Sequence, residues 1–353
     1  MRRTTVAAVA AALLASLTAC ANDAASTSHS GAAPAGQSVD GPKVKIMVGG
    51  LDKVIYLPAM LTQRLGYFAE AGVNVELLSE PAGVNATTAL LAGDVQGAVG
   101  FYDHTIDLQA KGKSVESVVQ FSQAPGEVEV VSSKQADAVK SGADFKGKKL
   151  GVTSLGSSTD FLTKYLAVKN GVQVSEFSPI AVGAGQTFIA ALQQGSIDAG
   201  MTTDPTVANI LAKDLGKVLY DMRTPEGSRA ALGGLYPSSS LYMNTDWVEK
   251  NKDTTQKLAN AFVKTLKWMS THSPEEIAAK MPADYGQGGA DQYAAAIKAT
   301  LPMFTTDGVM PADGPKTVLA VLAAFHPDVQ GKESSIDLAK TYTTEFVSKA
   351  AAG

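Results

Sequence analysis

Short apolar segments alternate with longer segments of helical periodicity along residues 44–240. The apolar segment Val44–Val48 is closed by glycines, which is typical of a buried strand, and the next segment repeats apolar residues three and four positions apart. Strands that alternate with helices predict mostly parallel sheets flanked by helices, so we expect an α/β fold. The expected helices include residues 56–71, a charged helix near 134–143 and, in a mostly helical C-terminal part, residues 254–271 and 336–350.

The same order of elements recurs about one hundred residues later in the chain. Gly171-Val172-Gln173-Val174 resembles Gly72-Val73-Asn74-Val75 at an offset of 99 residues, and Leu192–Ala199 resembles Leu90–Ala98 at an offset of 102. Two matches in the same order predict two copies of one βαβαβ unit. Because ligands bind beyond the carboxyl ends of strands in such sheets, we expect a binding site where those ends meet.

One stretch, Lys148–Gly171, predicts a strand, a polar turn and a helix in succession. Ser157 followed three residues later by Asp160 is an N-cap signature. A Gly-Ser-Ser-Thr turn at a helix start offers free backbone N–H groups, hydroxyls and the positive end of the helix dipole, which suit a carboxylate, sulfonate or phosphate. The alternative is that this turn only caps the helix, since Ser is a good cap.

Polar side chains follow the predicted strands or open the predicted helices at corresponding places in both repeats. Each could instead be a cap or a packing residue, but their shared position beyond strand ends favours a binding cleft. The candidate ligand-binding residues are Asp52, Lys53, Asn85, Tyr102, Asp103, His104, Ser154, Ser157, Ser158, Thr159, Gln186, Thr187, Asp204 and Tyr236.

The chemistry needed for an enzyme is missing from the sequence. The chain of 353 residues, long enough for two domains, has four histidines and one cysteine, and no zinc, calcium or P-loop motif. Gly151–Gly156 misses the nucleophile elbow by one residue, and Gly183–Gly185 lacks the third glycine of a dinucleotide fingerprint. We therefore expect no enzyme, metal or cofactor. The net charge of −4 gives no basic footprint for nucleic acid.

The N-terminus has the pattern of an export signal. Arg2 and Arg3 precede an apolar run too short to span a membrane, which ends just before Cys20. This pattern predicts a bacterial lipoprotein signal over residues 1–19 with Cys20 lipidated, and a flexible tether over residues 20–42 that is rich in Ala, Ser and Gly. An ordinary secretory signal is the alternative. Both kinds of signal predict an extracytoplasmic protein. The lipoprotein signal also predicts that the protein is anchored to the cell membrane.

The chain resembles the solute-binding proteins of ABC importers, specifically the nitrate/taurine/sulfonate family. The segments that carry the resemblance are Leu65–Glu76, Leu90–Val99, Asp144–Val152 with Gly156-Ser157-Ser158, and Ala191–Ala199. The resemblance implies a two-lobed periplasmic-binding-protein type II fold with the ligand cleft between the lobes. It implies a monomer that delivers its ligand to a permease and an ATPase. The expected lobes are 44–125 with 240–353, and 126–239.

The resemblance also places the anionic end of a ligand at Ser157, Ser158 and Thr159. Lys53 is the only candidate cation, however, and it accompanies three aspartates. A site for a bare anion would usually recruit Arg. We therefore expect a small polar or anionic organic ligand such as a sulfonate, an aromatic carboxylate or a pyrimidine, which could also carry an amine. The alternatives are an enzyme of the thiamine-pyrimidine-synthase type, which shares this fold, and an envelope scaffold without a transport role.

Overall fold

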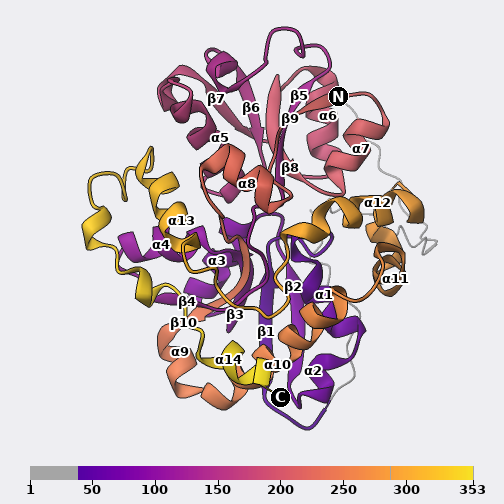
Figure 1. Ribbon diagram of the computed structural model, residues 1–353, viewed down its shortest axis with the longest axis vertical. Helices are drawn as coiled ribbons and strands as arrows, with labels where there is room; N and C mark the ends of the chain where they lie inside the picture. Colours follow the sequence, from indigo (N-terminus) through magenta and orange to yellow (C-terminus); the bar gives the residue numbers. More distant parts are fainter. Residues whose placement is uncertain (1–38, 287, 353) are drawn as a thin grey trace, which may run out of the picture.

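The computed structural model describes residues 39–286 and 288–352, which form two five-stranded sheets, one above the other in Figure 1. The predicted signal peptide, Cys20 and most of the predicted tether lie outside these residues. The strands are β1 Lys43–Val48, β2 Asn74–Ser79, β3 Gly97–Phe101, β4 Val115–Gln120, β5 Glu127–Ser132, β6 Lys149–Val152, β7 Ser178–Ala181, β8 Ala199–Thr203, β9 Gly216–Asp221 and β10 Ser239–Asn244.

Each sheet has four strands that run one way and one strand that runs against them. The orders are β2-β1-β3-β10-β4 and β7-β6-β8-β5-β9. The strands β10 and β5 are antiparallel to both of their neighbours, whereas β1, β2 and β3, like β6, β7 and β8, pair in parallel. The predicted α/β fold with mostly parallel sheets is confirmed, and so is the repeat of one βαβαβ unit.

The reversed strands show that the chain crosses between the sheets twice. The strand β5 opens the second sheet directly after β4, and β10 returns to the first sheet after β9. A reversed strand begins at the edge where its neighbours end, so Glu127 of β5 lies beside Thr203 of β8, and Ser239 of β10 lies beside Phe101 of β3. Residues from carboxyl ends and amino ends of strands therefore share one edge.

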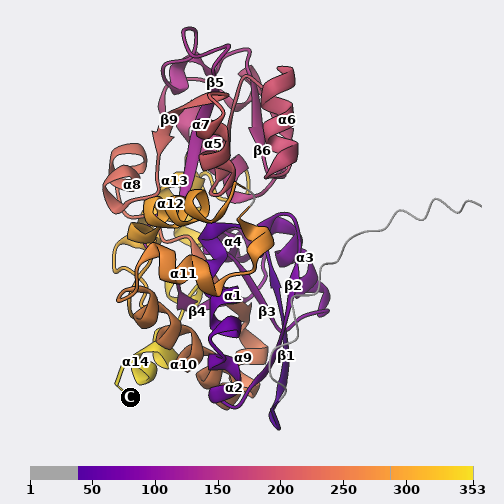
Figure 2. The same ribbon diagram turned by 90° about the vertical axis from the view of Figure 1, so that its right-hand side faces the viewer.

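The helices flank both sheets, and several late helices reach across the gap between them (Figure 2). The helix α10 buries Leu258, Phe262 and Leu266 in the same core as the first sheet. The helix α12 faces α7, where the Gln292 amide donates a hydrogen bond of 3.2 Å to Asn209. The α-helices are α1 Leu57–Arg64, α2 Tyr67–Glu70, α3 Gly83–Ala92, α4 Asp103–Ala110, α5 Ser158–Lys169, α6 Gln186–Gln194, α7 Thr206–Ala212, α8 Pro225–Leu232, α9 Thr245–Lys250, α10 Lys252–Met269, α11 Pro274–Lys280, α12 Ala290–Thr300, α13 Gly314–Ala323 and α14 Glu345–Ala352.

Two predicted helices are wrong in part or in full. Residues 134–141 form turns, because the Asp144 carboxylate accepts the backbone N–H groups of Lys140 and Ser141 and allows only a short 3-10 helix after them. Residues 336–344 contain one 3-10 turn, and the helix starts only at Glu345. There Ser117 of β4 exchanges backbone hydrogen bonds with Thr341 and Thr343, so the chain forms an isolated parallel bridge to β4 instead of a helix.

The predicted helix over residues 56–71 is broken rather than continuous. The helix α1 ends at Arg64, and α2 starts after Gly66, whose φ of 77° is a left-handed conformation that favours glycine. None of the described helices has both the length and the apolar character needed to cross a membrane.

Candidate functional site

A small cavity lies where the two sheets face each other. Its free volume is about 10 Å³, which is room for about one water molecule. The lining combines residues that follow β1 and β6, the start of α3, the amino end of β5 and the end of β8, so both sheets contribute. The lining residues are Lys53, Ile55, Tyr56, Gly83, Glu127, Thr153, Ser157, Ser158, Thr159 and Thr203.

Asp103 joins the two halves beside this cavity. It opens α4 directly after β3 and is fully buried. Its carboxylate accepts a hydrogen bond of 2.9 Å from the Ser158 hydroxyl, across the gap, and one of 2.8 Å from the Tyr236 hydroxyl. Burial raises the pKa of Asp103, while the neighbouring His104 and the two hydroxyls lower it. Three predicted residues, Asp103, Ser158 and Tyr236, therefore meet in one hydrogen-bonded group.

The start of α5 is capped differently from the prediction. The Ser157 side chain makes no cap hydrogen bond, but donates to the Ser154 carbonyl at 2.7 Å and pairs with the hydroxyls of Thr153 and Thr159. Asp160 instead accepts the Gly156 backbone N–H at 2.8 Å, because its carboxylate reaches back over the turn. The hydroxyls of Thr153, Ser157 and Thr159 thus satisfy one another, and the Ser158 hydroxyl donates to Asp103 at the start of α4.

Lys53 and Glu127 are the charged residues that line the cavity. The Lys53 ammonium donates to the carbonyls of Gly49 and Pro81 at 2.7 and 2.8 Å, and burial lowers its pKa to about 8. Glu127 is 2% exposed, and no described group donates a hydrogen bond to its Oε2. Burial raises the pKa of Glu127 well above its usual range, and the nearby Asp103 raises it further.

Two more buried polar atoms beside the cavity lack partners among the described groups. They are Nε2 of His104 and Oγ1 of Thr203. A Cβ atom added to Gly83 would lie 3.1 Å from that His104 nitrogen and 3.6 Å from the Tyr56 hydroxyl. The glycine therefore keeps this wall of the cavity open. Since buried polar groups are normally hydrogen-bonded, such a concentration of unpartnered atoms marks the cavity as a candidate site.

Asp204 anchors the two halves without lining the cavity. Its carboxylate accepts hydrogen bonds from Arg223 at 3.0 Å and from Thr300 at 3.2 Å, and its carbonyl accepts the Val54 backbone N–H at 3.0 Å. A cis peptide bond links it to Pro205. Burial raises the pKa of Asp204 despite the nearby Arg223 guanidinium, which lowers it. The sequence prediction did not include Arg223.

The other predicted residues lie outside the lining. Tyr102 is fully buried but pairs its hydroxyl with Thr341, which does not line the cavity. Thr187 donates to the Ala184 carbonyl at its own helix start. The exposed ones are Asp52, Asn85, Gln186 and Thr187, and Ser154 is half-buried in the turn before α5.

The sequence prediction did not include Glu127, Tyr56, Gly83 and Thr153, which line the cavity. It searched mainly beyond carboxyl ends of strands, and Glu127 starts a strand that runs the other way. A signal was present, because residues 127–132 read EVEVVS and are all buried in the structure. Two acids in a strand that is buried on both faces indicate that each carboxyl either binds a partner or destabilises the fold.

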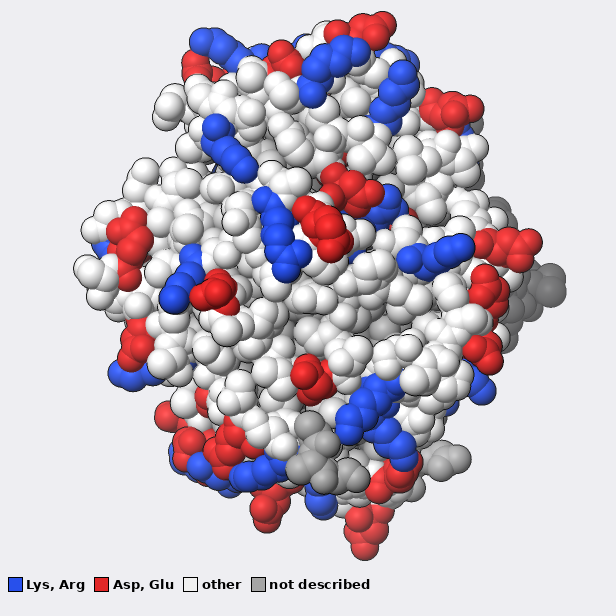
Figure 3. Space-filling view, in the orientation of Figure 1, with Lys and Arg blue, Asp and Glu red and all other residues white. Residues whose placement is uncertain are grey.

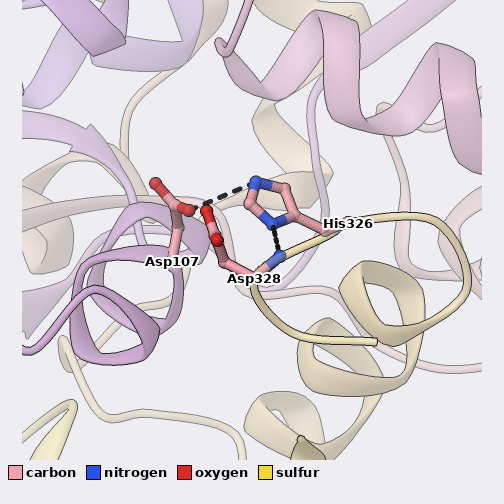
Figure 4. Close-up of side chains that lie close together, drawn as sticks. All are labelled: Asp107, His326 and Asp328. Carbon is pink, nitrogen blue, oxygen red and sulfur yellow. Dashed lines mark hydrogen bonds and ion pairs between the residues drawn. The ribbon is translucent and has the colours of Figure 1, made fainter. Parts of the chain in front are cut away.

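A second polar cluster lies one turn further along α4 (Figure 4). Donor atoms of Asp107, His326 and Asp328 all lie within 4.8 Å of one another, a spacing that could hold a metal ion. The Asp328 backbone N–H donates to Nδ1 of His326, so the neutral ring carries its proton on Nε2, 3.2 Å from Asp107. Lys111 lies 2.8 Å from the same carboxylate. A metal ion would have to displace the proton on Nε2 of His326 and the Lys111 ammonium, so we describe these residues as an ion-pair cluster.

Charged side chains are mixed over the face shown in Figure 3. Lys and Arg side chains lie among Asp and Glu side chains, without a continuous basic surface on that face. A nucleic-acid partner would require such a surface, so this face offers no support for one.

Comparisons with known proteins agree with this architecture. A protein from a Nostoc species, named nitrate/nitrite binding protein NrtA, is 22% identical over 280 residues, which cover 72% of this chain and 61% of that protein. The matched part of the chain thus covers less than two thirds of that relative's length. The Saccharomyces cerevisiae protein 4-amino-5-hydroxymethyl-2-methylpyrimidine phosphate synthase THI13 is 26% identical over 236 residues, covering 64% of this chain and 67% of that protein.

Solved structures show the same fold. One from Bordetella bronchiseptica RB50 is 35% identical with a TM-score of 0.84, covering 90% of this chain and 99% of that one. The periplasmic nitrate-binding protein NrtA from Synechocystis PCC 6803 is 14% identical with a TM-score of 0.70, covering 89% of each chain. The profile described as NMT1/THI5 like matches residues 56–277. The predicted resemblance is confirmed: the chain belongs to the NMT1/THI5-like family.

Proposed function

We propose that this protein is the solute-binding component of an ABC importer, which holds a small polar organic molecule between its two sheets. The observation that carries the proposal is the cavity itself. Both sheets line it, and buried polar atoms of Glu127, His104 and Thr203 face it or lie beside it without partners among the described groups. A relative named as a nitrate/nitrite binding protein supports a binding role.

The proposal requires the two halves to move apart. With room for about one water molecule, the cavity is too small for an organic solute in this conformation. We assign residues 44–125 and 240–353 to one lobe and 126–239 to the other, with hinges near 123–130 and 236–243. Opening would break the bond between Ser158 and Asp103 and the bond between Val54 and Asp204, and a solute would restore equivalent contacts on closure.

The proposed place of action is outside the cytoplasm. The export signal over residues 1–19 and a lipid on Cys20 would hold the protein at the cell membrane, where it would deliver the solute to a permease and its ATPase. Replacing Cys20 with Ala should release the protein from membranes of the bacterial host into the soluble extracytoplasmic fraction. Continued membrane association of that variant would contradict lipid anchoring.

An enzyme of the pyrimidine-synthase type is the second candidate. The identity to THI13 and the unpartnered Nε2 of His104 favour it. It predicts that a small-molecule substrate is consumed, and that His104→Gln abolishes this turnover while leaving the fold intact. The binding proposal predicts recovery of the solute unchanged after incubation, as judged by mass spectrometry.

A thermal-shift screen tests the binding proposal. Sulfonates, aromatic carboxylates, pyrimidines, amines and amino-acid derivatives would each be added to the purified protein. A solute at 100 times its dissociation constant should raise the Tm by about 5 °C. Small-angle scattering should then show compaction with that solute. The absence of any shift across the set would favour an envelope scaffold.

A further inference from the structure

We propose that the solute presents a cationic or N–H-rich group, such as an amidinium or an amino-substituted heteroaromatic ring, to Glu127, and that bare oxyanions are excluded. This inference rests on the proposed function and narrows its ligand class. Three observations support it. Glu127 lines the cavity with an unpaired oxygen, the Asp103 carboxylate already faces the start of α5, and Lys53 is the one cation among the described lining residues.

Glu127 is the free acceptor of the site. Its side chain lines the cavity and is almost fully buried, with 2% of the residue exposed. No described group donates a hydrogen bond to its Oε2. Leaving a buried acceptor unpaired costs free energy. A solute whose N–H group donates to this oxygen would regain that free energy on binding. The hydrogen bond would also be charge-assisted when the donor is a cation.

The start of α5 is occupied by a carboxylate of the protein. Asp103 accepts the Ser158 hydroxyl at 2.9 Å and the Tyr236 hydroxyl at 2.8 Å, so it takes the place that an anionic solute would need at that helix start. An oxyanion near Ser158 would approach the Asp103 carboxylate. Like charges at such distances in a buried site repel strongly.

Cations in the lining are too few to offset that repulsion. Among the described lining residues Lys53 is the only cation, and two backbone carbonyls already accept its hydrogen bonds. Burial lowers its pKa to about 8, so part of its charge is lost in mildly alkaline solution. Arg223 is engaged with Asp204 and Asp221 and does not line the cavity. The site therefore favours a cation over an anion.

The test uses probes of matched shape and opposite charge. Isothermal titration would compare benzamidine with benzoate, and 4-aminopyrimidine with pyrimidine-4-carboxylate, on the wild type and on Glu127→Gln. Glutamine keeps the size and the hydrogen-bonding capacity of a protonated glutamate but cannot become a carboxylate. The matched control is Glu129→Gln, two residues along the same strand, where the buried carboxyl accepts from Thr163 and lies outside the cavity lining.

We expect the cationic or amino member of at least one pair to bind, with a dissociation constant at least tenfold higher in Glu127→Gln and unchanged in Glu129→Gln. Because burial raises the pKa of Glu127 and a bound cation favours its carboxylate form, affinity for benzamidine should rise with pH over the range in which Glu127 titrates in the free protein. Titrations in buffers of different ionisation enthalpy should show about one proton released, a readout that needs no variant.

Three results would decide against the inference. Tighter binding of the carboxylate members would overturn it and leave the solute-binding function standing. Cation binding that Glu127→Gln leaves unchanged, with no proton release, would overturn the role of Glu127. If no member of either pair, and no compound of the wider screen, binds, the proposed function falls together with it.

Discussion

Two aspartates one turn apart on α4 have opposite surroundings. Asp107 accepts a hydrogen bond from the Lys111 ammonium at 2.8 Å and lies 3.2 Å from the His326 ring, so a cation and a histidine nitrogen face its carboxylate. Asp103 is fully buried and accepts only neutral hydroxyls, from Ser158 and Tyr236, apart from the His104 ring nitrogen 3.6 Å away. The same residue type on the same helix thus belongs to an ion-pair cluster in one case and, in the other, to a hydrogen-bonded group beside the cavity.

The comparison separates a structural cluster from a candidate site. Both groups combine aspartates with a histidine, and residue type alone would rank the Asp107 cluster higher because its spacing could suit a metal. What differs is pairing. The Oδ1 of Asp107 accepts no hydrogen bond among the described groups, but it has the Lys111 ammonium 2.8 Å away. Around Asp103 a glutamate, a histidine and a threonine keep atoms without a partner among the described groups. Unpaired buried groups that share a cavity indicate a ligand site.

The largest expected effect comes from exchanging the two aspartates for asparagine. Asp103→Asn should weaken binding of the best probe about 100-fold, because it removes a buried charged acceptor next to the ligand. Asp107→Asn should change binding less than twofold. Isothermal titration of both variants measures the difference. Equal losses in the two variants would abolish the distinction between the clusters.

A smaller effect is expected at Glu129, a buried acid that has an unpartnered atom but lies outside the cavity lining. Burial raises its pKa to about 8, so the folded state keeps a proton that the unfolded state loses near pH 4.5. Stability should therefore fall as pH rises between these values. Glu129→Gln cannot titrate and should recover about 2 kcal/mol at pH 7 relative to pH 5.5.

Urea unfolding of the wild type and Glu129→Gln at the two pH values provides the measurement. An unchanged pH dependence in the variant would show that this carboxyl titrates normally. Binding should stay unchanged in Glu129→Gln, because an unpaired acid in the protein interior has a stability cost without a role in the site.

Gly83 tests the shape of the cavity rather than its charge. In Gly83→Ala the added methyl group would lie 3.1 Å from Nε2 of His104, so that wall would move inward by a few tenths of an ångström. Affinity for the best probe should fall about tenfold, with the Tm within about 2 °C of the wild type. Gly93 is the C-cap of the same helix, and a Cβ added there would meet no atom within 4 Å. Because its φ of 81° is strained for alanine, Gly93→Ala measures the effect of backbone strain without a new contact. Isothermal titration measures the affinity and a melting curve measures the Tm. Full affinity in Gly83→Ala would show that the solute does not contact this wall.

The smallest effect is expected at His326. Burial lowers the pKa of this histidine, with Lys111 and Lys164 adding to the effect and Asp107 opposing it. The unfolded state therefore gains a proton that the folded state resists as pH falls below about 6.5. The His326 contribution to stability should decline over that range by up to about 1 kcal/mol per pH unit, and it is measured in the Glu129→Gln background because Glu129 titrates with the opposite effect on stability. His326→Gln should flatten the decline, as followed by urea unfolding from pH 7 to pH 5.5, and an equally steep decline would contradict it.

Local patterns predict most of the fold. The strands, the glycine helix stops and the repeat follow from apolar spacing, because each depends on residues close in sequence. The errors at 134–143 and 336–350 arise from contacts that no local pattern contains: a carboxylate that reaches back over a turn, and a segment that pairs with β4 from more than two hundred residues away.

The site is predicted only in part for a related reason. Beyond strand ends the sequence shows polar residues, but it does not show that Tyr102 turns toward Thr341 while Asp103 turns toward Ser158. Nor does it show that Glu127, at the start of a reversed strand, reaches the same edge as Thr203. Orientation and strand direction depend on the crossings between the sheets, which are properties of the assembled chain.

The most direct test of the account is a crystal structure of the protein with the tightest-binding probe of the screen. We predict density for the probe between the two sheets, with one of its N–H groups within hydrogen-bond distance of Glu127 and its other contacts from Ser158 or Tyr56. A probe found at the Asp107, His326 and Asp328 cluster, or on the outer surface with the Asp103 to Ser158 bond unbroken, would contradict the assignment.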